Sequence, residues 1–200
     1  MENGRGVRGL FGGGEDWGCG QWRLGFWEGC LGVLKLEMSL RSDDEEQEGF
    51  GESKIFSLRD RRILLDSADN PILTLQQKIL TAHRRWQVFR GQSSDPKDLL
   101  FSVKKSSLIQ FKTELDVFLA ANTKEEVCDF KVKGSWLERS CAIHLGNTPT
   151  IIAQMHRKHS VQSIVLGKDM FVVTVYPNVD YAFIVALVVV LEEINEDRED

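Results

Sequence analysis

The chain has 200 residues, 42% of them hydrophobic, and a formal net charge of −5 at pH 7. This length suits one domain with appendages and a sizeable core. The absence of an apolar leader and of any CxxC pair argues against a secreted, disulfide-stabilised protein. We therefore expect a cytoplasmic protein, peripheral at the plasma membrane or nuclear as alternatives, in which Cys128 and Cys141 are buried thiols.

The charge is distributed unevenly along the chain. Residues 1–53 carry 5 Lys/Arg against 11 Asp/Glu, residues 54–190 carry 19 against 13, and residues 191–200 carry 1 against 6. A basic body between acidic ends favours an anionic partner, such as a phosphoinositide headgroup or nucleic acid. The alternative is an ordinary solvated surface with lysines.

The first fifty residues differ in composition from the rest. Thirteen of the 17 glycines lie between Gly4 and Gly51, and an acidic run occupies residues 43–48. Because glycine disfavours regular elements, we expect residues 1–53 to be mostly disordered and to precede a domain at residues 54–195. Residues 196–200 are expected to form an acidic tail.

Short apolar runs separated by turn residues follow from residue 54 onward. Their spacing is typical of an all-β sandwich or barrel, and hairpin connections favour antiparallel pairing. The predicted strands cover residues 62–66, 72–78, 85–90, 99–103, 115–119, 128–132, 141–145, 151–155 and 171–176.

Eleven apolar residues run without a break from Tyr181 to Leu191. A membrane-spanning helix needs about 20 residues, so this run is too short to cross a bilayer. It has no polar face, so protein must enclose it. The β-branched residues leave a buried strand open, but the length and a cap at Asn178 or Asp180 favour a helix. A sheet of about 11 strands can close around one helix.

No motif for catalysis, a metal or a cofactor is convincing. Residues 4–9 match GxGxxG but lack the flanking strand and helix, and Gly167-Lys168 is not followed by Ser or Thr. His156 and His159 flank an Arg and a Lys, which repel a cation. We therefore expect no cofactor and no enzymatic activity, although catalytic groups can also assemble from distant positions.

Basic residues form the candidate site. Lys131 and Lys133 alternate with Val132, so a strand places both on one face. Together with basic residues on other strands they could hold a phosphorylated headgroup, and the alternative is a scattered solvent face. Trp86 is interpreted either as core or as a membrane-inserting residue. The predicted lipid- or anion-binding residues are Arg84, Arg85, Lys104, Lys105, Lys131, Lys133, Arg157 and Lys158.

Six segments of the chain are similar to one known family. They are SLRDRR at residues 57–62, AHRRWQVFRG at 82–91, DLLFSVK at 98–104, FKTELDVFL at 111–119, DFKVKGSW at 129–136 and VYPNVDYAF at 175–183. Together they resemble the plant LURP-one-related family from about residue 54 to residue 195.

The resemblance implies a tubby C-terminal-like fold, a twelve-stranded barrel around a central hydrophobic helix. It also implies kinship with phosphoinositide-binding tubby proteins and phospholipid scramblases, and a link to plant defence. No catalytic or headgroup-binding residue is carried over from the family.

The family usually begins with further strands, and the glycine-rich stretch stands in their place. We therefore expect a mainly β fold, a barrel of about ten to twelve strands around the C-terminal helix, with its first strands in question. The predicted function is a non-enzymatic module that binds anionic phospholipid. The alternative is a protein–protein interaction module, and nucleic acid is a minor third possibility.

Overall fold

The computed structural model describes residues 20–26, 33–41, 51–58, 61–66, 68–78, 85–106, 113–135, 140–157 and 169–196. Within them lie the strands β1 (Gly20–Phe26), β2 (Val33–Arg41), β3 (Gly51–Leu58), β4 (Arg61–Leu65), β5 (Pro71–Lys78), β6 (Arg85–Arg90), β7 (Leu99–Lys105), β8 (Thr113–Leu119), β9 (Phe130–Ser135), β10 (Ser140–Leu145), β11 (Ile151–Arg157) and β12 (Asp169–Val175). A 3₁₀ turn, η1 (Pro96–Asp98), precedes β7, and the helix α2 (Tyr181–Glu196) follows β12.

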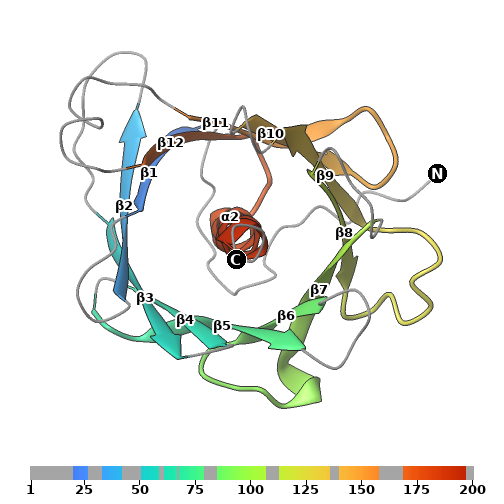
Figure 1. Ribbon diagram of the computed structural model, residues 1–200, viewed down its shortest axis with the longest axis horizontal. Helices are drawn as coiled ribbons and strands as arrows, with labels where there is room; N and C mark the ends of the chain where they lie inside the picture. Colours follow the sequence, from blue (N-terminus) through green and yellow to red (C-terminus); the bar gives the residue numbers. More distant parts are fainter. Residues whose placement is uncertain are drawn as a thin grey trace.

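The strands form an antiparallel meander. Each strand from β2 to β12 pairs with its neighbours in the chain, and β1 pairs with both β2 and β12, so the strand order is that of a closed barrel. Seen along its axis, the sheet surrounds α2 (Figure 1). The antiparallel sheet with the C-terminal helix packed against it confirms the predicted mainly β fold.

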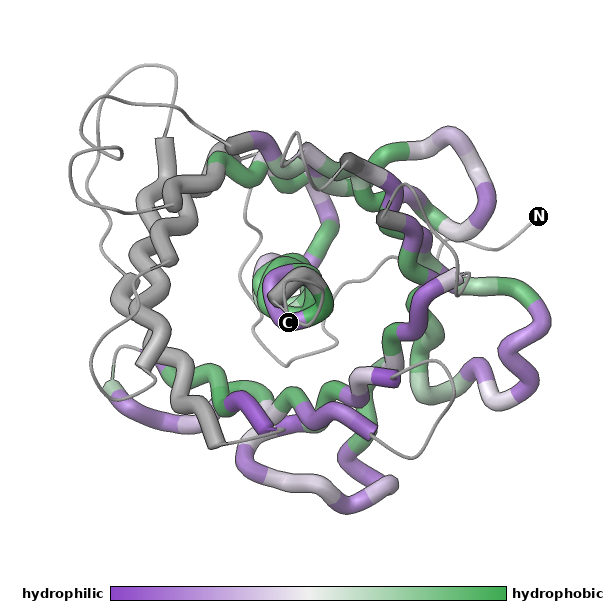
Figure 2. The backbone as a smooth tube through the Cα atoms, viewed as in Figure 1, coloured by the Kyte–Doolittle hydropathy of each residue, from purple (hydrophilic) through white to green (hydrophobic). Residues whose placement is uncertain are grey.

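From Ala182 to Leu191 the helix α2 is apolar on all sides, and its polar residues follow in the last turns. Most of the helix is accordingly green in Figure 2. Every residue from Ala182 to Leu191 is at most 5% exposed, and so is Ile194. At its start, the Oδ1 atom of Asp180 accepts a hydrogen bond of 2.9 Å from the backbone N–H of Ala182, so Asp180 caps the helix. The prediction of a buried helix is confirmed. Among the described residues, no helix is long and apolar enough to cross a membrane.

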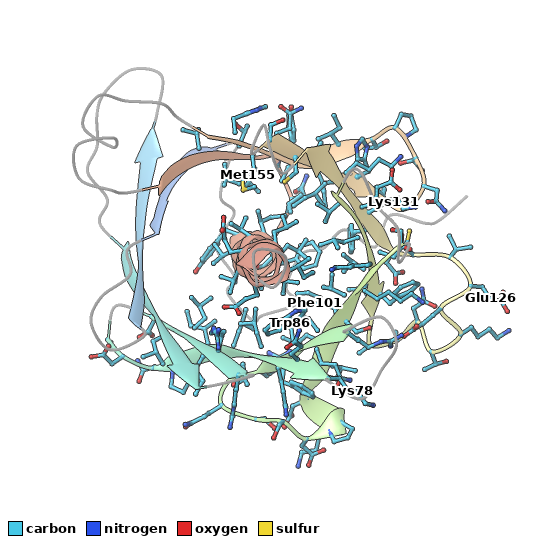
Figure 3. The ribbon with its side chains drawn as sticks, viewed as in Figure 1. Lys78, Trp86, Phe101, Glu126, Lys131 and Met155 are labelled. Atoms are coloured by element: carbon cyan, nitrogen blue, oxygen red, sulfur yellow. The ribbon has the colours of Figure 1, made fainter. Side chains whose placement is uncertain are left out.

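The helix packs against the inward-facing side chains of the strands. The ring of Phe183 lies between those of Phe101 and Phe130, with centroid distances of 5.0 and 4.9 Å. Trp86 is 2% exposed and belongs to the same core, as Figure 3 shows from its position beside α2. The interpretation of Trp86 as a core residue is therefore confirmed.

Two cysteines that were expected to be buried thiols are free and buried. Cys141 lies in β10, and burial together with the charge of Glu192 raises its pKa to about 12. Cys128 lies just before β9, which begins two residues later than predicted, and burial raises the pKa of its thiol as well. Both side chains stay protonated at neutral pH, which makes them poor nucleophiles.

The segment predicted to be disordered, residues 1–53, contains β1, β2 and the start of β3. Its remaining residues lie outside the described part of the chain, and the boundary at residue 53 stays a prediction. Leu34, Leu36, Met38 and Leu40 alternate with polar residues, a strand pattern that the glycine content concealed. Pairing with β12 and β3 supplies the backbone hydrogen bonds that offset the entropic cost of the nearby glycines.

Candidate anion-binding surface

A row of five charged residues and one histidine crosses the outer face of the barrel from β5 to β10. These residues alternate along their strands with inward-facing core residues, and the pairing register places them side by side. The row consists of Lys78, Arg85, Lys104, Asp116, Lys131 and His144. With neighbouring strands about 4.8 Å apart, it spans roughly 24 Å. Lys78 and Lys131 lie on the outer side of the sheet in Figure 3. We call these six residues the outer row.

Four of the eight predicted site residues meet on this surface. Arg85, Lys104 and Lys131 belong to the outer row, and Lys133 lies on the same face of β9, opposite Glu114 of β8. The prediction that Lys131 and Lys133 share a face is confirmed by this register.

Of the other four predicted residues, the structure describes the side chain of Lys105 alone, and it does not join them. Lys105 follows Lys104 in β7 and therefore faces the opposite side of the sheet, where its register partner is the core residue Leu115. Arg157 ends β11, but its side chain lies outside the described residues, as do Arg84 and Lys158 altogether. Whether these residues contribute to one site stays a prediction.

Arg85 and Lys104 converge on one carboxylate, that of Glu125. The guanidinium of Arg85 donates two hydrogen bonds, from Nη1 to Oε1 at 2.5 Å and from Nη2 to Oε2 at 2.6 Å. The Nζ of Lys104 donates to Oε2 at 3.3 Å and lies 4.4 Å from the centre of the Phe118 ring. This is the two-pronged geometry with which arginine holds carboxylates and phosphates.

The loop between β8 and β9 carries Glu125 to this position. The side chain of Asn122 donates to the carbonyl of Val127 at 2.8 Å and to Oδ2 of Asp129 at 2.9 Å. The backbone N–H of Glu125 donates to Oδ1 of Asn122 at 3.1 Å, and Glu125 has a φ of 51°. This left-handed conformation costs a residue other than glycine about 1 kcal/mol or more, so the loop holds Glu125 under strain.

A second carboxylate partly neutralises the row. Asp116 Oδ1 lies 3.3 Å from the Nζ of Lys131. Sequence reasoning named the basic residues but missed Glu125 and Asp116, which contact three of them. Asp116 could have been found from the alternation in β8, which places it on the outer face. Glu125 is in a loop, and no local pattern indicates which strands the loop covers.

The ion pair also sets the charge state of Glu125. The hydrogen bond from Arg85 holds the pKa of this carboxyl below its ordinary value, partial burial opposes the shift, and the charges of Arg85 and Lys104 add to it. Glu125 is therefore ionised at neutral pH and available as an anion for the two cations.

The stability that Glu125 contributes should depend on pH. Because folding lowers its pKa, the contribution is complete above the ordinary value near 4.5 and is lost as the pH falls through the lower folded-state value. We expect urea unfolding to give a difference in unfolding free energy between the wild type and Glu125→Gln that is full near neutral pH and shrinks below that ordinary value.

The neighbouring residue provides the control for this experiment. Glu126 is exposed and lies on the outside of the molecule in Figure 3. Glu126→Gln removes the same charge and should change the unfolding free energy little at any pH. A Glu125→Gln difference that stays constant across the acidic range would contradict the ion pair.

Two further arginines, Arg61 and Arg62, do not share one surface. Arg62 faces inward and pairs with Glu193 of α2, with Nε to Oε1 at 2.5 Å and Nη2 to Oε2 at 2.7 Å. Arg61 donates from Nη2 to the carbonyl of Gln92 at 2.6 Å. Within the described ranges, no group of three or more His, Cys, Asp and Glu residues could hold a metal ion.

The comparisons with known proteins agree with this architecture. The family model described as LURP-one-related matches residues 42–192. The chain belongs to the LURP-one-related family. The match begins before residue 54, so the family's sequence includes part of the segment that was predicted to precede the domain.

Individual relatives of the family are similar over most of the chain. Protein LURP-one-related 15 of Arabidopsis thaliana is 61% identical over 145 residues, which cover 72% of this chain and 67% of the relative. Protein LURP-one-related 10 of the same plant is 56% identical over 73% of this chain and 76% of its own. A crystal structure of an Arabidopsis thaliana protein matches with a TM-score of 0.68 and 38% identity, over 96% of this chain and 99% of that one.

Proposed function

We propose that this member of the LURP-one-related family is a binding module, not an enzyme, and that it binds anionic phospholipid through the outer face of β5 to β9. The observation that carries the proposal is the convergence of Arg85 and Lys104 on a single carboxylate. Two cations from neighbouring strands that hold a carboxylate have the chemistry to hold a phosphate.

The charge balance of this face supports the same partner. The cations are Lys78, Arg85, Lys104, Lys131 and Lys133, and the acidic side chains among them are Glu114, Asp116 and Glu125. Five positive against three negative charges leave a surplus of two. A basic residue near an anionic membrane contributes about 1 kcal/mol, so binding should be weak and sensitive to salt.

We further propose that the protein is a closed, tubby-like barrel in solution and that this barrel holds the outer face of β5 to β9 rigid. The pairing of β1 with both β2 and β12 supports closure. A closed sheet has no unpaired edge strand and keeps the outer row at a fixed spacing. Removal of residues 1–50 takes away β1 and β2, and we expect it to expose sheet edges and to promote aggregation.

Liposome co-sedimentation tests the proposal. Vesicles that contain a phosphatidylinositol phosphate should retain the protein at low salt, and neutral phosphatidylcholine vesicles should not. The retained fraction should fall as salt is added. Equal recovery with both kinds of vesicle, or no recovery with either, would rule out lipid binding by this face.

A protein partner is the second candidate, and a different observation favours it. Among the described residues, the exposed large apolar side chains are Val127, Leu145, Tyr176 and Tyr181. In an antiparallel meander the segments that contain them lie at one end of the barrel, where α2 begins. The family resemblance suggests a partner in defence signalling. Affinity purification that recovers one stoichiometric protein with the wild type, but not with Tyr176→Ser/Tyr181→Ser, would favour this function.

A further inference from the structure

The β8–β9 loop places a carboxylate where an anionic ligand would bind. Both oxygens of Glu125 are used, Oε1 by Arg85 and Oε2 by Arg85 and Lys104. The side chains of the three residues are 23–27% exposed, so solvent reaches this contact. An anion that approaches from solvent therefore meets two cations that already hold a carboxylate.

We propose that Arg85 and Lys104 form a binding site for a phosphate monoester and that Glu125 is its internal competitor. The ligand displaces the Glu125 carboxylate, and the loop moves away from β6 and β7. The proposal rests on the proposed binding of anionic phospholipid, because it names the ligand group and the regulation of that same face. A phosphate monoester carries more negative charge than a carboxylate and offers three acceptor oxygens, so it satisfies both cations at once.

The conformation of the loop makes displacement feasible. Glu125 has a left-handed φ of 51°, and a residue other than glycine is released from strain when it leaves that conformation. Partly exposed ion pairs are weak, because water and salt screen them. The strain and the screening both reduce the free energy that the ligand must supply.

The anchors of the loop confine the movement. Asp129 Oδ2 accepts from the backbone N–H of Leu119 at 2.9 Å and from Asn122. These contacts close the base of the loop and involve neither Arg85 nor Lys104. Residues near Glu125 can therefore leave the cations while the base of the loop stays closed.

The experiment compares Glu125→Gln with Glu126→Gln in binding to vesicles that contain a phosphatidylinositol monophosphate. Both variants remove one negative charge from adjacent positions, so long-range electrostatics change nearly equally. Glu125→Gln should bind about fivefold more tightly than the wild type, the equivalent of one partly exposed ion pair. Glu126→Gln should bind within about twofold of the wild type.

Hydrogen exchange of the wild-type protein provides a measurement that needs no variant. The amides of residues 123–126 should exchange faster when the vesicles are bound and when a soluble inositol phosphate is added at saturation. Acceleration by vesicles alone would identify the lipid as the source of the phosphate group, and acceleration by both would show that the headgroup suffices. Unchanged exchange in both arms would overturn the displacement of Glu125.

The outcomes separate this inference from the proposed function. Wild-type binding that neither variant changes would overturn the role of Glu125 and leave lipid binding in place. No binding by the wild type or by either variant would overturn lipid binding itself. Binding by Glu125→Gln alone would support both, with Glu125 fully blocking the wild-type site.

Discussion

Val189→Asp should prevent folding or lower the free energy of unfolding by about 4 kcal/mol or more. Val189 is 1% exposed and lies in the middle of α2, where the sheet surrounds the helix. An ionised carboxylate there has neither water nor a cation beside it on the helix. A domain of this size is stable by about 5–15 kcal/mol, so the loss is a large share of the total. Val185→Asp, at 5% exposure, should behave alike.

The same substitution at an exposed position is the control. Val127, in the β8–β9 loop, is 60% exposed. We expect Val127→Asp to change the unfolding free energy by no more than about 0.5 kcal/mol. If Val189→Asp does not fold, Val189→Thr replaces it in the measurement. Threonine keeps the shape of valine, so this variant should lose a smaller, measurable part of the unfolding free energy. Equal melting temperatures for Val189→Asp and the wild type would show that α2 is not enclosed.

Arg62→Met should destabilise the protein by about 3–5 kcal/mol. Arg62 and Glu193 join β4 to the last turns of α2, and their side chains are 13% and 10% exposed. Removal of the arginine leaves the glutamate charge buried beside methionine. Equilibrium unfolding in urea, followed by tryptophan fluorescence, measures the loss.

Two further variants separate the ion pair from the loss of packing. In Arg62→Met/Glu193→Met both charges are absent, and we expect a free energy of unfolding within about 1 kcal/mol of the wild type. The control is the exposed pair of Lys97 and Asp95, whose Nζ and Oδ2 atoms are 3.2 Å apart and whose side chains are 74% and 48% exposed. Lys97→Met breaks this pair and should lower the free energy of unfolding by less than about 1 kcal/mol. A double variant as unstable as Arg62→Met would contradict the explanation by an uncompensated charge.

The sequence predicted the strands β4 to β12 and the helix α2 because each of them has a strong local pattern. Strand β6 was expected at residues 85–90 and is found there, because Trp86 and Val88 alternate with polar residues between turn signals. The helix followed from a run of apolar residues too long for a strand and too short for a bilayer. The strand β2 was not predicted, because the glycines on both sides of it mask the alternation of Leu34, Leu36, Met38 and Leu40.

The candidate site was predicted less completely, for physical reasons. Side chains alternate between the two faces of a strand, which correctly predicted that Lys131 and Lys133 share a face. The same alternation would have placed Lys104 and Lys105 on opposite faces. Ion pairs between distant segments carry no local signal. The contact of Arg85 with Glu125 spans 40 positions, and that of Arg62 with Glu193 spans 131. These pairs decide which cations face solvent and which stabilise the fold.

Charge reversal at two exposed lysines tests the location of the binding face most directly. Lys133 lies on the outer face of β9. Lys97 lies in the connection that follows β6. Arg85 is the first residue of β6, so Lys97 and Arg85 are at opposite ends of that strand. Lys133→Glu and Lys97→Glu change the net charge equally. In titrations with phosphatidylinositol phosphate vesicles, Lys133→Glu should weaken binding about 30-fold, from about 1 kcal/mol for each unit of charge. Lys97→Glu should weaken it by about twofold or less. Equal losses would show that binding follows net charge alone and would contradict a binding face on β5 to β9.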